Sequence, residues 1–169
     1  MRMRDGEARG RDGRAWAILF ARGVLGLIFF MAGRWKVFVL TPIGHAHRWF
    51  VDPYADTFLP AWSLWLTGVT IPFVELLGGA LLLLGWRVRE ALIALGFVLL
   101  IVTFGHLLKE PLYEFHTHVI PRLALLVFVL MFPGEDDRFS MDAWLARRGG
   151  APLPAPQGTA PQGTAPQGS

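Results

Sequence analysis

Residues 61–85 have the sequence AWSLWLTGVTIPFVELLGGALLLLG, an apolar run in which Glu75 is the single charged side chain. A membrane-spanning helix needs about 20 mostly apolar residues, with a range of about 17–25. The run therefore predicts a transmembrane helix. A charged side chain inside a bilayer costs about 3 kcal/mol even on the most lenient scale. Glu75 consequently needs an ionic partner, a wet cavity or a chemical role.

Three other apolar segments extend this prediction to a helical bundle. The composition agrees, because 53% of the 169 residues are hydrophobic and only 17% are charged. We predict an all-α membrane protein in which residues 15–133 form a four-transmembrane-helix bundle, with spans at about 15–36, 61–85, 89–108 and 115–132. The fourth span is the least regular, since its purely apolar part is short and it must include Arg122 to cross.

The basic residues predict the orientation of the bundle, because cytoplasmic loops carry an excess of lysine and arginine. Ten basic residues lie in the N-terminal segment, the turn after the second span and the C-terminal segment, and four lie in the two opposite loops. Both termini are therefore predicted to be cytoplasmic. The net charge of +3 then reflects this topology and contact with the lipid bilayer, and no nucleic-acid partner is expected.

The segments outside the spans differ in composition. Residues 1–14 are polar and basic and are predicted to be disordered or to lie on the headgroups, and residues 34–60 are rich in aromatic side chains that suit the membrane interface. Residues 134–150 are predicted to form a cytoplasmic interfacial segment with a short helix at 140–148. Residues 151–169 repeat a Pro-Gln-Gly unit and are predicted to be a disordered tail. The chain contains no cysteine, which excludes disulfide and thiol chemistry.

Arg22 is the charged residue within the first span, as Glu75 is within the second. At 1.5 Å per residue, Arg22 would lie about 10 Å from the cytoplasmic face and Glu75 about 15 Å from it. This predicts an intramembrane ion pair between Arg22 and Glu75 that fixes the register of the two helices. The alternative is a proton or substrate path through a wet cavity.

Several short motifs together resemble the DoxX family of membrane proteins. They are RGVLG at residues 22–26, AGRWK at 32–36, ELLGG at 75–79, LLLG at 82–85 and the Ser-x-Asp pattern within DRFSMD at 137–142. The positions that match the family pattern are Arg22, Gly26, Gly33, Lys36, Glu75, Gly78, Gly79, Ser140 and Asp142. The glycines lie on the helix faces that carry the charges, where small residues allow close helix contact.

The resemblance implies a four-helix protein of the bacterial inner membrane that is associated with redox systems. A quinone headgroup would need hydrogen-bond donors at the membrane interface and an apolar slot for its tail. Polar residues at the outer ends of the spans are candidates for such a pocket, and Phe97, Phe104 and Phe128 of the third and fourth spans are candidates for the slot. The polar candidates are Arg34, Lys36, Arg122, His106, Glu110 and Glu114. Alternatively, Arg122 extends to the headgroups without binding a ligand.

All five histidines fall on the predicted outer side, at positions 45, 47, 106, 116 and 118. Imidazole binds zinc, copper, nickel and iron, and a histidine at a helix end is a possible axial ligand of haem. His106 with His116 or His118 is the best candidate for a metal or haem site, and His45 with His47 is a second. The simpler interpretation is that these are interfacial histidines, since side chains two positions apart in a helix point in different directions.

Three functions are consistent with the sequence. The first is a subunit of, or accessory to, a quinone-linked redox complex, with other membrane or soluble redox proteins as partners in a homo- or hetero-oligomer. The second is a non-catalytic scaffold or assembly subunit, and the third is a metal- or tetrapyrrole-binding membrane protein. The chain has no phosphate-binding loop and no G-x-S-x-G motif. If it is an enzyme, we expect an oxidoreductase subunit that is inactive alone.

Overall fold

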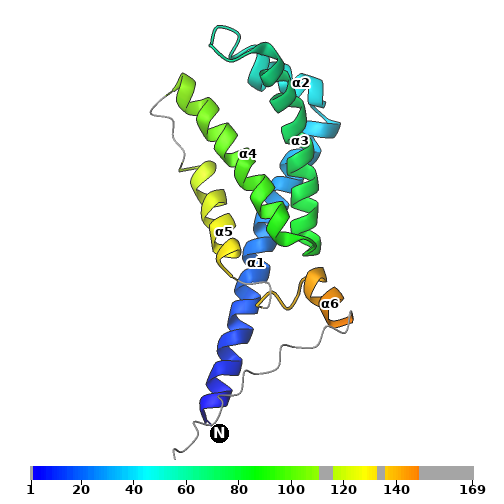
Figure 1. Cartoon of the computed structure of the whole chain (residues 1–169), viewed down its shortest axis with the longest axis vertical. Helices are drawn as coiled ribbons and strands as arrows, with labels where there is room; N and C mark the ends of the chain where they lie inside the picture. Colours follow the sequence, from blue (N-terminus) through cyan, green and yellow to red (C-terminus); the bar gives the residue numbers. More distant parts are fainter. Residues whose placement is uncertain (1, 111–115, 133–135, 149–169) are drawn as a thin grey trace, which may run out of the picture.

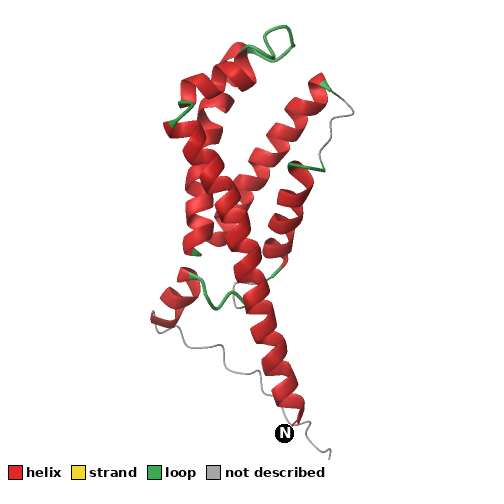
Figure 2. Cartoon of the chain, turned by 180° about the vertical axis from the view of Figure 1, so that it is seen from behind, coloured by secondary structure: helices red, strands yellow, loops and turns green. Residues whose placement is uncertain are grey.

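The computed structural model describes residues 2–110, 116–132 and 136–148, with only the backbone described for residues 2–9 and 11 (Figure 1). The predicted tail at residues 151–169 lies outside the described residues. The described parts are helical and contain no strand (Figure 2). The elements are α1 (Arg2–Phe38), α2 (Pro42–Ala46), the π-helical η1 (His47–Val51), α3 (Ala61–Leu84), α4 (Val88–Lys109), α5 (Val119–Met131) and α6 (Met141–Arg148).

Among the described residues, three helices are long and apolar enough to cross a membrane. They are Asp12–Phe38 within α1, Ala61–Leu84 and Val88–Lys109, which coincide with the first three predicted spans. The apolar helix α5 has 13 residues, or about 20 Å at 1.5 Å per residue, against a hydrocarbon core of about 30 Å. The predicted start of the fourth span is wrong, because residues 116–118 form a turn and the helix begins at Val119. The part before residue 116 lies outside the described residues.

Glycines bring α1 and α3 into direct backbone contact. A Cβ atom added to Gly33 would lie 2.3 Å from the amide nitrogen of Leu76, and one added to Gly79 would lie 2.3 Å from that of Phe30. These contacts show that the two helices run antiparallel. Gly26 lies on the same face, whereas Gly78 packs against Leu95 of α4. Three of the four motif glycines therefore form the α1–α3 contact, and the fourth allows α4 to approach.

The apolar core runs between the four longest helices. Leu25 and Phe29 of α1 pack with Leu82 of α3 and with side chains of α4 and α5. The buried members from the last two helices are Ala91, Leu92, Leu95, Leu99, Leu126 and Val129. Two ends of the bundle are named here for what covers them. The α6 end contains the turn 85–87 and α6, and the α2 end contains α2 and η1 (Figure 1).

The N-terminal segment departs from the prediction of disorder. Its backbone continues α1 without interruption to Arg2, so the helix has 37 residues and a length of about 55 Å. The first turns project beyond the rest of the bundle (Figure 2). Asp12 accepts a hydrogen bond from Arg138 at 2.9 Å, which ties this helix to the segment before α6. No proline interrupts the segment, and adding residues to an already formed helix does not incur the cost of nucleation.

Candidate functional site

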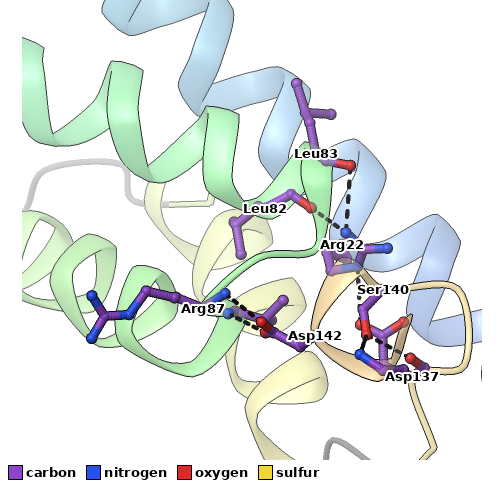
Figure 3. A network of polar contacts seen from close by, with 9 residues as sticks. Arg22, Leu82, Leu83, Arg87, Asp137, Ser140 and Asp142 are labelled. Atoms are coloured by element: carbon purple, nitrogen blue, oxygen red, sulfur yellow. Dashed lines mark hydrogen bonds and ion pairs between the residues drawn. The ribbon is translucent and has the colours of Figure 1, made fainter. Parts of the chain in front are cut away.

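The predicted ion pair between Arg22 and Glu75 is wrong, because each residue has another partner. Arg22 Nε lies 3.1 Å from Asp137 Oδ2, and Arg22 Nη1 donates to the carbonyl oxygens of Leu82 and Leu83 (Figure 3). Glu75 Oε2 instead accepts from Lys36 Nζ at 2.6 Å. The bundle therefore holds two separate buried carboxylates, one at each end.

The register of α1 against α3 explains this difference. Gly33 lies against Leu76, and Arg22 lies beside Leu82 and Gly85. The 11 residues from Arg22 to Gly33 correspond to about 16 Å along the helix. The depths calculated from the sequence assumed that the first span begins near residue 15 and the second ends near Gly85, both at the cytoplasmic face. In the structure, Arg22 and not residue 15 lies at the level of Gly85. Lys36, about one turn beyond Gly33, is then the basic residue within reach of Glu75.

The motif residues Ser140 and Asp142 join α6 to the start of α4. Asp142 accepts hydrogen bonds from the backbone N–H groups of Arg87 at 3.0 Å and Val88 at 3.2 Å (Figure 3). These are donors that the first turn of a helix leaves without an internal partner. Ser140 Oγ accepts from Ala143 N at 3.1 Å and so caps α6. The Ser-x-Asp pattern therefore has a structural role at the α6 end.

Asp137 is the residue at this end that sequence reasoning missed. Burial raises the pKa of its carboxyl group, the Arg22 guanidinium lowers it and the Asp142 carboxylate raises it. Asp137 Oδ1 has no hydrogen-bond partner among the described residues, and the close approach of Oδ2 to Arg22 lacks hydrogen-bond alignment. The residue lies within the quoted motif DRFSMD, but its position after the last span concealed its contact with Arg22.

At the α2 end, Lys36, the partner of Glu75, lines a cavity of about 200 Å³, together with several other residues that were predicted for the outer side. Lys36, His45, Tyr54 and His106 supply its polar groups. Apolar and aromatic side chains complete the wall, namely Trp49, Phe50, Ile71, Ile101 and Val102, with Gly105. A smaller cavity of about 130 Å³ shares Phe50, Tyr54, Ile101 and Gly105 with it.

His45 is held in the cavity wall by a backbone group that a proline has freed. Pro72 has no N–H, so the carbonyl of Gly68 lacks its partner within α3. His45 Nδ1 lies 2.7 Å from this oxygen, which assigns Nδ1 as the donor. Gly68 also admits α2, since an added Cβ would lie 2.6 Å from Ala46 Cα. Proline, glycine and histidine therefore act together to position one imidazole.

The His45 imidazole is neutral near pH 7. Burial lowers its pKa from the ordinary value of 6.5, the hydrogen bond to Gly68 raises it and the Lys36 charge lowers it. A neutral ring that donates from Nδ1 carries a lone pair on Nε2 and accepts a hydrogen bond there.

This lowered pKa predicts a pH-dependent stability. The folded protein binds fewer protons at His45 than the unfolded chain, so stability decreases as pH falls through about 6.5. His45→Gln keeps a hydrogen-bond donor and removes the titration. We expect the difference in free energy of unfolding between the parent protein and this variant to decrease from pH 7.5 to about 5. A constant difference over that range, measured by chemical denaturation in detergent, would contradict the assignment.

Some residues of the predicted polar pocket line the α2-end cavity, and the others lie elsewhere. Lys36 and His106 line the cavity, but Arg34 and Glu110 are exposed, and Glu114 lies outside the described residues. The guanidinium of Arg122 lies 5.9 Å from the ring centroid of Phe29 in α1. The apolar wall lies between α3 and α4 beneath α2 and η1, and not between the third and fourth spans. Trp49 and Tyr54 were missed as lining residues because their chain segment lacks a regular pattern.

The predicted histidine metal site is not assembled in the described part of the chain. His116 and His118 are exposed in the turn before α5, and His47 Nδ1 pairs with Asp52 at 3.2 Å on the surface. His45 and His106 line one cavity. Residues 2–110, 116–132 and 136–148 contain no group of three or more histidine, cysteine, aspartate and glutamate side chains that would hold a metal ion.

Comparison of the chain with models of protein families, with curated proteins and with solved structures found no match. The class of this protein is assigned here from its fold. The three long apolar helices in the described part of the chain suggest a multi-pass membrane protein.

Proposed function

We propose that this chain is a DoxX-like membrane protein that binds a quinone headgroup at the α2 end, as a subunit of or accessory to a redox complex. The observation that supports this most is the cavity of about 200 Å³ that is lined by Lys36, the partner of the buried Glu75. The excess of basic residues at the opposite end supports an orientation with both termini in the cytoplasm of a bacterium. The cavity then lies at the outer side of the inner membrane.

The hydrogen-bonding groups of the cavity complement those of a quinone. Lys36 Nζ donates one hydrogen bond to Glu75, and an ammonium group has three donors, so it can also bind a quinone carbonyl. His45 Nε2 is an acceptor, which suits the hydroxyl group of the reduced form. Trp49 and Phe50 provide aromatic surfaces for offset stacking on the ring.

The size of the cavity favours one ring over a larger cofactor. Sites for drug-sized ligands have volumes of about 300–1,000 Å³, and this cavity has about 200 Å³. Such a space suits a quinone headgroup, with the isoprenoid tail leaving past Ile101 and Phe104 of α4, which are partly exposed. A tetrapyrrole exceeds this volume, so the cavity favours the quinone over the haem alternative.

Titration of the purified protein with a short-chain quinone tests this proposal. Trp49 lies in the cavity wall, so bound quinone is expected to quench tryptophan fluorescence in a saturable manner. Gly105→Leu places a side chain where an added Cβ would lie 3.1 Å from the Tyr54 hydroxyl, and is expected to weaken binding at least tenfold. Gly23→Leu is the matched control, because nothing lies within 4 Å of its added Cβ.

Two results would contradict the proposal. One is quenching by quinone that does not saturate in the parent protein, and the other is equal affinity in the parent protein and Gly105→Leu. Absence of saturable binding in a preparation that still co-purifies with redox proteins in mild detergent would favour the scaffold function instead.

A further inference from the structure

The Tyr54 side chain borders two cavities at the α2 end. It lines both the cavity of about 200 Å³ that contains Lys36 and the neighbouring cavity of about 130 Å³. Its hydroxyl group lies against Gly105 of α4, because a Cβ atom added to Gly105 would lie 3.1 Å from Tyr54 Oη and 3.6 Å from Tyr54 Cζ. The absence of a side chain at position 105 therefore leaves room for this hydroxyl group.

Contacts of the backbone and of the ring hold Tyr54 in place. Its carbonyl oxygen accepts hydrogen bonds from Thr57 Oγ1 at 2.7 Å and from Thr57 N at 3.1 Å, which close the turn. Lys109 Nζ lies 5.5 Å from the centroid of the Tyr54 ring, and it also pairs with Asp56 of the same turn at 3.7 Å. These contacts position the phenol ring without using its hydroxyl group.

The Tyr54 hydroxyl group is available to a ligand. It makes no hydrogen bond to any residue that the structure describes, and burial is the cause that raises the pKa of the phenol. In the described part of the chain, the fully enclosed side-chain atoms without a hydrogen-bond partner are Arg22 Nε and the two Asp137 oxygens, so the Tyr54 hydroxyl retains accessible surface. Such a half-buried hydroxyl group is satisfied by water or by a ligand.

We propose, on the basis of the quinone site described above, that Tyr54 is a specificity-determining residue and that its hydroxyl group binds the second ring oxygen of a 1,4-quinone. Lys36 enters the cavity from α1, whereas the Tyr54 hydroxyl lies against α4, so the two donors approach from different helices. A 1,4-quinone has its oxygens on opposite sides of the ring and uses both donors. A ring with one oxygen uses the charged donor, Lys36, alone.

Two ligands that differ by one oxygen test this proposal. A hydroquinone with a short side chain has both ring oxygens, and the phenol with the same side chain lacks one of them. We expect Tyr54→Phe, in the full chain in detergent, to weaken binding of the hydroquinone about fivefold by calorimetry, which is the effect of one neutral hydrogen bond. Binding of the phenol should be unchanged, because the phenylalanine ring keeps the contacts with Gly105 and Lys109.

Ser63→Ala is the control, because it also removes a hydroxyl group near the site. Ser63 lines the smaller cavity, but its hydroxyl group already donates to the Pro60 carbonyl at 2.7 Å, so this variant should bind both compounds as the parent protein does. Unchanged affinity of Tyr54→Phe for the hydroquinone, or an equal loss for both compounds, would overturn the role of Tyr54 and leave the quinone site standing. Absence of saturable hydroquinone binding in the parent protein would instead reject both.

Discussion

Replacing Gly79 by alanine is expected to destabilise the protein by about 3 kcal/mol or more, at the upper end of the range for overpacked sites. The added Cβ would lie 2.3 Å from the amide nitrogen of Phe30 and 2.9 Å from the carbonyl oxygen of Gly26. Both contacts are with backbone, which cannot rotate away as a side chain does. The helices α1 and α3 would have to separate along the contact that also holds the Lys36–Glu75 pair.

Gly23→Ala is the matched control for this prediction. It adds the same methyl group to a helix interior, but nothing lies within 4 Å of the added Cβ. Alanine is favoured over glycine in helices by about 1 kcal/mol, so this variant should be as stable as the parent protein or more so. Thermal unfolding in detergent measures both. Equal stability of the Gly79→Ala and Gly23→Ala variants would show that α1 and α3 are not in backbone contact.

Replacing Lys36 by methionine is expected to cost more stability than replacing Glu75 by leucine, although both changes break the same ion pair. The Glu75 side chain is 7% exposed and that of Lys36 is 21% exposed. Lys36→Met therefore leaves a carboxylate buried without a partner, and loss of one member of a buried pair costs about 3–5 kcal/mol. Glu75→Leu leaves a long ammonium side chain that can extend toward the headgroups.

The double variant Lys36→Met/Glu75→Leu completes the cycle. It buries no charge at this position, so we expect it to recover most of the stability lost in Lys36→Met. Denaturation of the four proteins in one detergent gives the coupling energy. If the losses in free energy of unfolding of the two single variants simply add in the double variant, the ion pair between Lys36 and Glu75 would be contradicted. If Glu75→Leu were the more damaging single change, the burial argument would be wrong.

The positions of the first three long helices could be predicted from the sequence because each contains a long apolar run with at most one charged side chain. Span length depends on hydrocarbon thickness, and that constraint acts on each helix alone. The helix faces that make contact could also be predicted from the sequence, since Gly33 and Gly79 lie on the same faces as charged residues. The short helix α6 was predicted as well, and Ser140 caps its start.

The charge pairing could not be predicted in the same way because it depends on how far one helix is displaced along another. The contacts of Gly33 with Leu76 and of Gly79 with Phe30 set a register that places Arg22 at the level of Leu82 and gives Glu75 a different partner. Asp137 was concealed for a related reason. It follows the last span by several residues, and only folding of the segment 136–148 under the bundle places it beside Arg22.

Only part of the lining of the cavity at the α2 end could be predicted from the sequence. Its histidines and Lys36 were candidates, but Trp49 lies in η1 and Tyr54 in the turn after it, and the path of this segment depends on tertiary contacts. Pro72 and Gly68 determine that path together, one by freeing a carbonyl for His45 and the other by making room for Ala46. Each residue alone has many explanations in a membrane helix. Their joint role becomes visible only when α2 is placed against α3.

The most direct test of the quinone proposal is photo-crosslinking with an azido-quinone in proteoliposomes, followed by mass spectrometric mapping of the modified residues. We predict crosslinks in residues 49–54 and 101–106, two segments that contribute most of the lining of the α2-end cavity. Unlabelled quinone should compete for them, and they should be absent from Gly105→Leu. Saturable crosslinks at Phe97 or Phe128, with none in residues 49–54, would contradict this location.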